Sequence, residues 1–300
     1  MRVGRLPLFA LLALWLIWGY SWIVLKIALR YSAPFDFAAL RTFLGALCLL
    51  AVLPFTGHPL RPRRLGGLFV LGLVQTSAYM GLSMWALVEG GAGRTAVLVF
   101  TMPFWTVLLA WALLDERLRA MQWAAVLLAA TGLLLVLQPW SLAGSVLSKS
   151  LAIGAGAVWA ASAIMVKRFQ ATDPMDLLSL TAWQMLLGTV PLALIAWGMP
   201  SPPIDWSMIF ILALAFNAVA TTAVGWLLWL YVLHRLPAGA AGMSMLAIPV
   251  IAILASWLQL GERPVLVEWV GMLLIGIALL LLSLHALGQH RELAPPVAPE

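Results

Sequence analysis

Residues 66–88 read GGLFVLGLVQTSAYMGLSMWALV and contain no charged side chain. An α-helix rises 1.5 Å per residue, so roughly 20 apolar residues cross the hydrocarbon core of a bilayer, which is about 30 Å thick. This stretch therefore predicts a transmembrane helix. Gln75, Thr76 and Ser77 lie near its middle, where polar groups are costly unless they face the interior of the protein.

The composition extends this conclusion to the whole chain of 300 residues. Hydrophobic residues make up 64% of it and charged residues 9%, whereas soluble proteins carry about 25% charged residues. A water-soluble fold is therefore excluded. Together with residues 66–88, further apolar stretches predict an all-α membrane protein of ten transmembrane helices. These stretches are residues 8–30, 35–55, 92–114, 120–138, 149–168, 174–198, 207–233, 238–260 and 265–286.

Basic residues in the short connections predict how the chain sits in the membrane, because cytoplasmic loops are enriched in Lys and Arg. With the N-terminus inside, the cytoplasmic side receives Arg2, Arg5, Arg61, Arg63, Arg64, Arg117, Arg119, Lys167, Arg168, Arg235 and Arg291, and the outer side receives Arg30, Arg94, Lys149 and Arg263. This bias predicts a multi-pass protein of the bacterial inner membrane with both termini cytoplasmic. The net charge of +6 is therefore explained by basic loop residues that orient the protein in the membrane, and it does not indicate nucleic-acid binding.

The two halves of the chain resemble each other. A shift of 146 residues aligns, without a gap, Thr76 with Thr222, Pro103 with Pro249, Trp111 with Trp257 and Glu116 with Glu262. An odd number of helices in each copy makes the second copy enter the membrane from the opposite face. The pattern therefore predicts two inverted five-helix repeats, residues 1–145 and 146–287, followed by a disordered cytoplasmic tail, residues 288–300.

Several short motifs point to a known family. They are Trp18-Gly19 with Lys26, Arg41, Pro103 and Asp115-Glu116-Arg117, echoed in the second half by Trp159, Lys167, Pro249 and Gly261-Glu262-Arg263. Together they resemble the EamA-type family of the drug/metabolite transporter superfamily, and the aromatic-rich spans are most similar to the YddG-type amino-acid exporters. The resemblance implies a transporter. One position departs from the symmetry: in the second span, where a shift of 140 residues aligns Pro34 with Pro174, Thr181 stands where the second half would match Arg41.

In transporters built from inverted repeats, the substrate site lies near the bilayer midplane between the repeats. The polar and aromatic residues at that depth form the predicted substrate-binding set: Trp18, Trp22, Gln75, Thr76, Tyr79, Thr101, Trp159, Ser162, Asn217, Thr222 and Ser244. Their rings would bury a side chain and attract an ammonium group by cation–π interaction. In the alternative interpretation the hydroxyls only join helices and the mid-span Trp side chains only fill space.

Prolines and isolated charges inside the spans mark further candidate residues. Pro103 and Pro249 predict helix breaks or gating elements, since proline removes a backbone donor and disturbs the preceding turn. Arg41 lies within the second predicted span, where a charge needs a partner, and Asp36 is close enough in sequence to serve. Lys26 either has a charge role or extends to the headgroups.

These features predict a transporter that exports small amphipathic metabolites by alternating access around a midplane cavity, with hydrophobic or aromatic amino acids as the leading substrates. The sequence leaves open other metabolites or drugs, including sugar phosphates, although a phosphate would need more positive charge than Lys26 and Arg41 supply. A structural role without transport also stays open.

A membrane-embedded enzyme is the remaining rival class. Such an enzyme needs convergent acids, histidines or metal ligands, but His58, His234, His285 and His290 all fall in predicted loops, span ends or the tail. We therefore expect no enzymatic activity, no cofactor and no metal. The expected partners are a small-molecule substrate and the lipid bilayer, without nucleic acid. The sequence does not fix the oligomeric state and is compatible with a monomer.

Overall fold

The computed structural model describes residues 5–114, 120–138, 145–235, 245 and 247–292. Within these ranges the chain is helical and contains no β-strand, in agreement with the all-α prediction. The predicted site residue Ser244, the motif Asp115-Glu116-Arg117 and the end of the predicted tail lie outside the described residues.

Helices follow one another along the described chain with short connections. Their bounds are α1 Arg5–Ala28, α2 Pro34–Val52, η1 Pro54–Thr56, α3 Leu65–Gly72, η2 Leu73–Ala78, α4 Tyr79–Glu89, α5 Ala92–Val99, α6 Met102–Leu114, α7 Ala120–Leu137, α8 Val146–Thr172, α9 Leu177–Gly198, α10 Met208–Ala215, η3 Phe216–Val224, α11 Gly225–Arg235, α13 Ala247–Leu260 and α14 Leu266–Glu292.

Seven helical stretches of the described residues are long and apolar enough to cross a membrane. They are Leu8–Ala28, Pro34–Thr56, Leu65–Glu89, Ala92–Leu113, Val146–Thr172, Leu177–Gly198 and Met208–Val232. Three shorter apolar helices, Ala120–Val136, Ala247–Leu260 and Leu266–Leu281, lie where the other predicted spans were expected. The chain is thus a multi-pass helical membrane protein, while the count of ten spans and the inverted repeat stay predictions.

The third and eighth predicted spans change helical geometry near their middle. The segments η2 and η3 are π-helices, which continue α3 into α4 and α10 into α11. In both, a hydroxyl bonds to a carbonyl five residues earlier: Ser77 Oγ donates to Gly72 O at 3.4 Å, and Thr222 Oγ1 donates to Asn217 O at 2.9 Å. Such wider turns are often found at functional sites.

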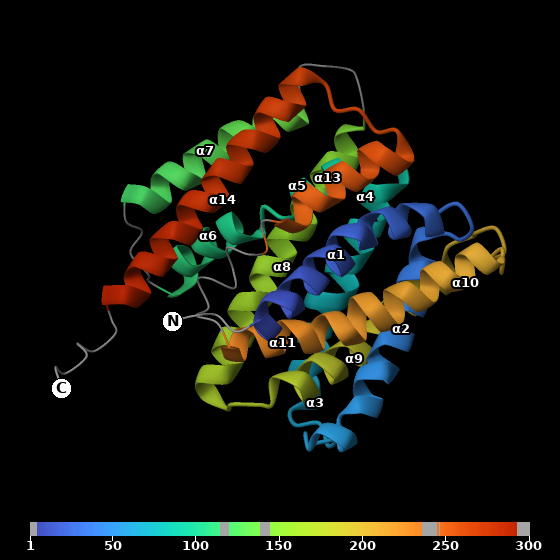
Figure 1. Cartoon of the computed structure of the whole chain (residues 1–300). Helices are drawn as coiled ribbons and strands as arrows, with labels where there is room; N and C mark the ends of the chain where they lie inside the picture. Colours follow the sequence, from blue (N-terminus) through green and yellow to red (C-terminus); the bar gives the residue numbers. More distant parts are fainter. Residues whose placement is uncertain (1–4, 115–119, 139–144, 236–244, 246, 293–300) are drawn as a thin grey trace.

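The helices form one bundle with a helix pair at its edge. In Figure 1, α7 and α14 lie side by side at this edge, whereas α1, α2, α8, α9 and α11 lie in the main body. The edge pair packs closely because both helices place a glycine at the crossing. A Cβ added to Gly132 would lie 2.7 Å from Gly271 O, and the same distance separates a Cβ at Gly271 from Gly132 O.

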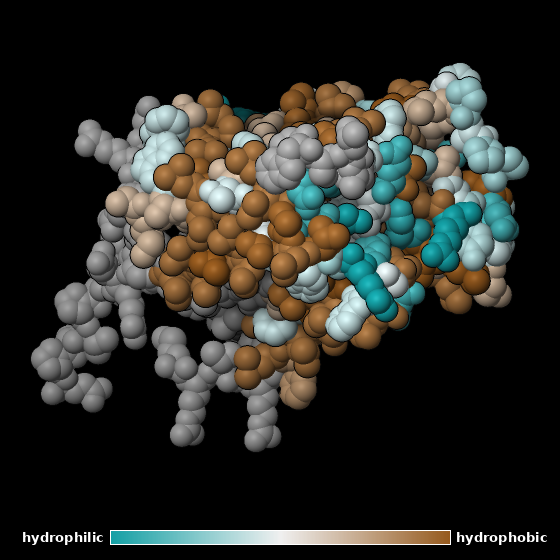
Figure 2. Space-filling view, turned by 90° about the horizontal axis from the view of Figure 1, so that it is seen from above, coloured by the Kyte–Doolittle hydropathy of each residue, from teal (hydrophilic) through white to brown (hydrophobic). Residues whose placement is uncertain are grey.

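The outer surface suits a lipid environment. Figure 2 shows apolar residues over most of the face in view, with polar residues gathered in one band. Large apolar side chains such as Trp197, Leu258 and Leu266 are exposed. In water this much apolar surface would promote association, but in a bilayer it faces acyl chains.

Candidate substrate cavity

The described residues line a partly open cavity between helices from both halves of the chain. Its volume is about 140 Å³. The lining side chains come from α1, α2, η2, α4, α6, α8, α9, η3, α11, α13 and the α5–α6 connection. They are Trp18, Ser21, Trp22, Leu25, Arg41, Thr42, Gln75, Thr76, Tyr79, Met80, Ser83, Phe100, Met102, Trp159, Gln184, Met185, Thr221, Thr222, Trp226 and Ile248.

Aromatic rings form one continuous part of the cavity wall. The Tyr79 ring lies 5.0 Å from the Trp159 ring, and Trp159 lies 6.3 Å from Trp226. Trp226 in turn meets Trp18 edge-on, with 6.4 Å between their centroids. Four helices, α4, α8, α11 and α1, thus contribute to a single ring network, whose faces could hold an apolar side chain or a cation.

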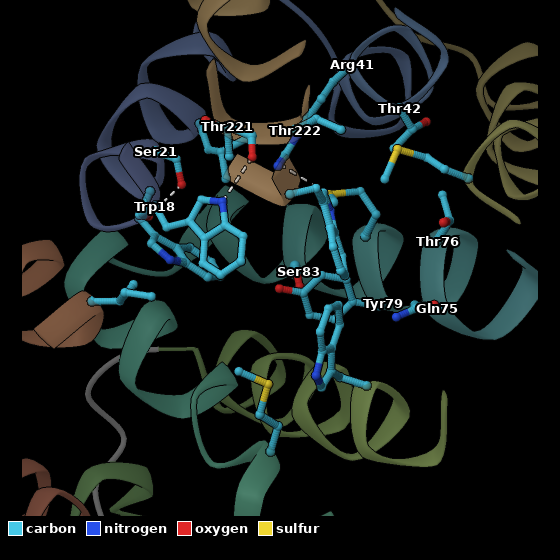
Figure 3. A pocket seen from close by; sticks show the side chains of 18 of the residues that line it. Trp18, Ser21, Arg41, Thr42, Gln75, Thr76, Tyr79, Ser83, Thr221 and Thr222 are labelled. Atoms are coloured by element: carbon cyan, nitrogen blue, oxygen red, sulfur yellow. Dashed lines mark hydrogen bonds between the residues drawn. The ribbon is translucent and has the colours of Figure 1, made fainter. Parts of the chain in front are cut away.

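The Trp18 indole is fixed by the π-helical segment η3. Its Nε1 donates a hydrogen bond to the Thr221 carbonyl at 2.9 Å, as Figure 3 shows. Gly225 makes room for this contact, because a Cβ there would lie 3.1 Å from Trp18 Cε2. Ser21 donates to the Trp18 carbonyl at 2.7 Å and anchors the same turn of α1. A tryptophan with its N–H satisfied presents an apolar face to the cavity.

The polar side of the cavity joins η2 to α9. Thr76 Oγ1 donates to Gln184 Oε1 at 2.8 Å, and Ser77 Oγ donates to Gly188 O at 2.5 Å. Both bonds are buried, and a buried polar group is costly unless it is paired. They therefore hold the π-helical segment at a fixed distance from α9.

Arg41 carries the only formal charge among the described residues that line the cavity. Its side chain is 8% exposed and reaches from α2 into the cavity (Figure 3). Nη1 donates to Met80 Sδ at 3.4 Å, and Nε has no hydrogen-bond partner among the described groups. No ion pair between described residues includes Arg41, and Asp36 instead accepts a hydrogen bond from Ser201 at 3.1 Å.

The structure brings many of the predicted substrate-binding residues together. Trp18, Trp22, Gln75, Thr76, Tyr79, Trp159 and Thr222 all line the cavity. The other described members of the set are buried but do not line it. Thr101 donates to Leu98 O at 2.6 Å, Ser162 donates to Trp159 O at 2.7 Å, and Asn217 Nδ2 donates to Ala213 O at 3.0 Å. These groups bond to their own helix or helix end, the behaviour expected of Ser, Thr and Asn in apolar surroundings.

The prolines and Lys26 lie beside the cavity and not on its wall. Pro103 is the second residue of α6, directly after the break at Phe100 and Thr101, and Pro249 is the third residue of α13. Proline fits the first turn of a helix because the N–H it lacks would have no partner there. Lys26 Nζ donates to the carbonyls of Leu87 and Val88 near the end of α4.

Sequence reasoning did not single out several lining residues. Gln184, Trp226 and Ser83 lie on helix faces that the sequence alone does not orient. Trp226 could have been predicted, because it is a tryptophan inside a predicted span, away from the ends where tryptophans of the membrane interface lie. Gln184 likewise is a buried amide within a predicted span, where such groups need a partner.

We find no cluster of three or more His, Cys, Asp or Glu side chains in the described part of the chain that could hold a metal ion. Charged side chains away from the cavity bind helix ends or pair with one another. Glu262 Oε1 accepts from the Ala92 N–H at 2.7 Å and thereby caps α5, while Arg94 pairs with Glu268 at 2.7 Å.

Comparison with known proteins adds a family match over most of the chain. The EamA-like transporter family matches at residues 5–138 and again at residues 147–284. The first range falls within residues 1–145 and the second within residues 146–287, the limits of the two predicted repeats.

Curated relatives cover nearly the full length. The uncharacterized transporter YoaV of Bacillus subtilis (strain 168) is 27% identical, over 87% of this chain and 90% of its own. A protein of Escherichia coli (strain K12) named "Probable amino-acid metabolite efflux pump" is 28% identical, over 86% and 88%. The uncharacterized inner membrane transporter YedA of the same strain is 26% identical, over 97% and 94%.

A solved crystal structure shares the fold. It aligns with a TM-score of 0.64 over 99% of this chain and 100% of its own, at 19% sequence identity. At this level of identity the comparison concerns the arrangement of helices alone.

Proposed function

We propose, on the premise that the chain belongs to the EamA-like transporter family, that it exports small amphipathic metabolites across the inner membrane, with hydrophobic or aromatic amino acids as its main substrates. A general role in transport follows from the family and from relatives named as transporters. The substrate class and the mechanism, alternating access around the cavity, are the proposal.

The chemistry of the cavity wall is the observation that carries this proposal. A network of aromatic rings faces a single guanidinium and a few hydroxyl and amide groups. An apolar amino acid matches all three features, because its side chain is apolar, its ammonium suits ring faces and its carboxylate suits a cation. The name of the E. coli relative, an amino-acid metabolite efflux pump, supports the same class.

The size and charge of the cavity disfavour the rival substrates. Its volume of about 140 Å³ lies below the range of roughly 300–1,000 Å³ that is usual for drug-sized ligands. A sugar phosphate carries close to two negative charges, while Arg41 is the one cation among the described lining residues. Both arguments favour a small molecule with one anionic group.

Flux from proteoliposomes tests the proposal. The purified protein would be reconstituted into vesicles loaded with radiolabelled phenylalanine, alanine, a quaternary-ammonium dye or glucose 6-phosphate. We expect phenylalanine to leave faster than from protein-free vesicles, and glucose 6-phosphate to leave no faster. Equal rates for all compounds with and without protein would contradict transport, and selective release of the phosphate or the dye would contradict the substrate class.

Orientation gives a separate prediction. In the ten-span arrangement we propose, reporter enzymes fused after Arg64 or Arg235 are expected to be active in the cytoplasm, and those fused after Gly90 or Pro202 in the periplasm, because the basic connections stay inside. In Figure 1 the start of α1 and the end of α14 lie toward the same side, which suits an even number of crossings. Two or more reversed reporters would refute this topology.

Energy coupling gives a further prediction. Proton-driven carriers keep a titratable acid or histidine inside the bundle, but the described lining residues include no Asp, Glu or His. A substrate gradient alone should therefore drive flux, and an imposed pH gradient should change the initial rate by less than about twofold. Uphill accumulation that is driven by a pH gradient and lost in Asp36→Asn would instead assign proton coupling to that carboxylate.

A further inference from the structure

Arg41 lacks the partner that a buried guanidinium requires. The group has five N–H donors in a planar fork, and a carboxylate or phosphate is the acceptor that matches this geometry. The acceptor it has among the described residues is the thioether of Met80, at 3.4 Å from Nη1. A thioether is a weak acceptor and carries no charge, so no described residue compensates the positive charge of Arg41.

No acid from the neighbouring helices can supply the missing charge. The elements packed against α2 are α4, α9, α10, η1 and η3. Among them, α4 carries an acid only at its last residue, Glu89, and α9 has Asp176 only at its N-cap, where it pairs with His58 at 2.7 Å. On α2 itself, Asp36 accepts from Ser201. Each of these acids is at a helix end, and none forms an ion pair with Arg41.

Two other hydroxyl groups line the same cavity. Thr221 Oγ1 is buried without a hydrogen bond to a described group, whereas the Ser83 hydroxyl lies against the Tyr79 phenol; the two residues are 6% and 2% exposed. Buried hydroxyls are normally paired, so an unpaired one in a native structure calls for an explanation. Arg41, Ser83 and Thr221 come from three different helices and all line the cavity. Together they offer one anion-binding fork and two groups that either donate or accept.

We propose that Arg41 binds the α-carboxylate of the transported molecule, and that the Ser83 and Thr221 hydroxyls complete the hydrogen bonds of its polar end while the aromatic network holds its apolar side chain. This inference rests on the proposed function and adds the residue that selects a carboxylate. A substrate carboxylate cancels the buried charge of Arg41. Binding of a carboxylate therefore gains free energy that a neutral analogue does not gain.

Binding of matched acids and amides tests this assignment. Affinities of purified protein in nanodiscs would be measured by calorimetry for phenylalanine, phenylalaninamide, 3-phenylpropionate and phenyl phosphate. We expect phenylalanine to bind about tenfold to a hundredfold more tightly than phenylalaninamide, the usual effect of one hydrogen-bonded charge. In Arg41→Gln the ratio should fall to about one, with the affinity for the amide nearly unchanged. Tighter binding of phenyl phosphate than of either carboxylate would overturn the assignment.

Three further variants separate recognition from folding. Arg30→Gln removes an exposed arginine just after α1 and should keep the full ratio. Arg41→Lys keeps the positive charge but not the planar guanidinium, so phenylalanine should still bind more tightly than phenylalaninamide, by a smaller factor than in the parent protein. Arg41→Met replaces the buried charge with an apolar group, which is often tolerated, and it should fold and bind acid and amide equally. A wild-type ratio near one, or a ratio that survives in Arg41→Met, would refute the inference.

The same preparation distinguishes this inference from the proposed function. Proteoliposomes that release phenylalanine while Arg41→Met keeps its preference for the acid would leave transport intact and refute the role of Arg41. If the wild-type protein prefers the acid in an Arg41-dependent way but releases no phenylalanine from proteoliposomes, the role of Arg41 in binding stands and the proposed transport of phenylalanine is refuted.

Discussion

Trp159→Ala is expected to lower the initial rate of phenylalanine efflux from proteoliposomes by roughly tenfold. Trp159 lies between Tyr79 and Trp226, at centroid distances of 5.0 and 6.3 Å, so its removal interrupts the aromatic wall. The contact that this ring would make with a bound substrate, a cation–π interaction of about 1–2 kcal/mol in a desolvated site, corresponds to roughly a tenfold change in the stability of the loaded site. Tyr79→Ala should act in the same direction, because it removes one end of the same network.

Two variants control for this result. Trp197→Ala removes a tryptophan of the same size that is 88% exposed near the end of α9, so it should leave efflux unchanged. Trp159→Phe keeps a ring in the cavity wall and should retain most of the rate. Each vesicle preparation must contain equal amounts of monodisperse protein by size-exclusion chromatography. If Trp159→Ala and Tyr79→Ala both export at the parental rate, the rings only pack helices together.

The fold class could be predicted because the signals for it are local. A charge-free apolar stretch as long as residues 66–88 is stable only across a bilayer, and the family motifs recur in the second half, 141 residues on for Trp18 and Lys26 and 146 residues on for Pro103 and Glu116. What the sequence did not predict is the detail inside a span. Residues 65–89 form one continuous helical stretch, yet its middle adopts π-helical turns at η2.

The reason for these turns lies in competition between side chains and backbone. Within η3, Thr222 Oγ1 donates to the Asn217 carbonyl five residues earlier at 2.9 Å, which stabilises a wider turn. At η2 the single Ser77 proton lies between Gly188 O at 2.5 Å and Gly72 O at 3.4 Å, so the shorter bond, across to α9, dominates. Both π-helices end at equivalent positions under the shift of 146 residues, Ala78 and Val224. The polar runs Gln75-Thr76-Ser77 and Thr221-Thr222 were visible in the sequence, but the change in helical geometry was not.

The aromatic and polar character of the candidate site could be predicted from the sequence, but several of the individual residues that line it could not. Depth in the membrane identifies residues such as Trp18 and Thr76, but it does not tell which face of a helix points inward. Thr101 and Ser162 show the consequence, because each was expected at this depth but does not line the cavity and instead donates to a carbonyl three residues earlier. Asp36 was the nearest acid to Arg41 in sequence, but in space its partner is Ser201 of the other half.

The crossing of α9 with the α3–η2 junction supports the polar side of the cavity, and its close approach depends on Gly72 and Gly188. A Cβ at Gly188 would meet the Gly72 carbonyl oxygen and lie 2.6 Å from Thr76 Cβ. A Cβ at Gly72 would lie 2.8 Å from Gly188 N. These distances allow Ser77 to reach Gly188 O and Thr76 to reach Gln184. Neither α9 nor the α3–η2 segment can move away from the other without breaking these buried hydrogen bonds.

Gly188→Ala is therefore expected to destabilise the protein by about 3 kcal/mol or more, at the upper end of the usual cost of overpacking, because the clash is with backbone. The control is Gly198→Ala in the same helix, where a Cβ would meet nothing within 4 Å. That variant should be neutral or stabilised by about 0.4–1 kcal/mol, the usual effect of alanine at a compatible glycine. The measurement is the fraction of each detergent-solubilised variant that stays monodisperse after stepwise heating. Equal melting of the two variants would mean that α9 can move away from η2, and that the π-helical segment does not depend on this crossing for its position.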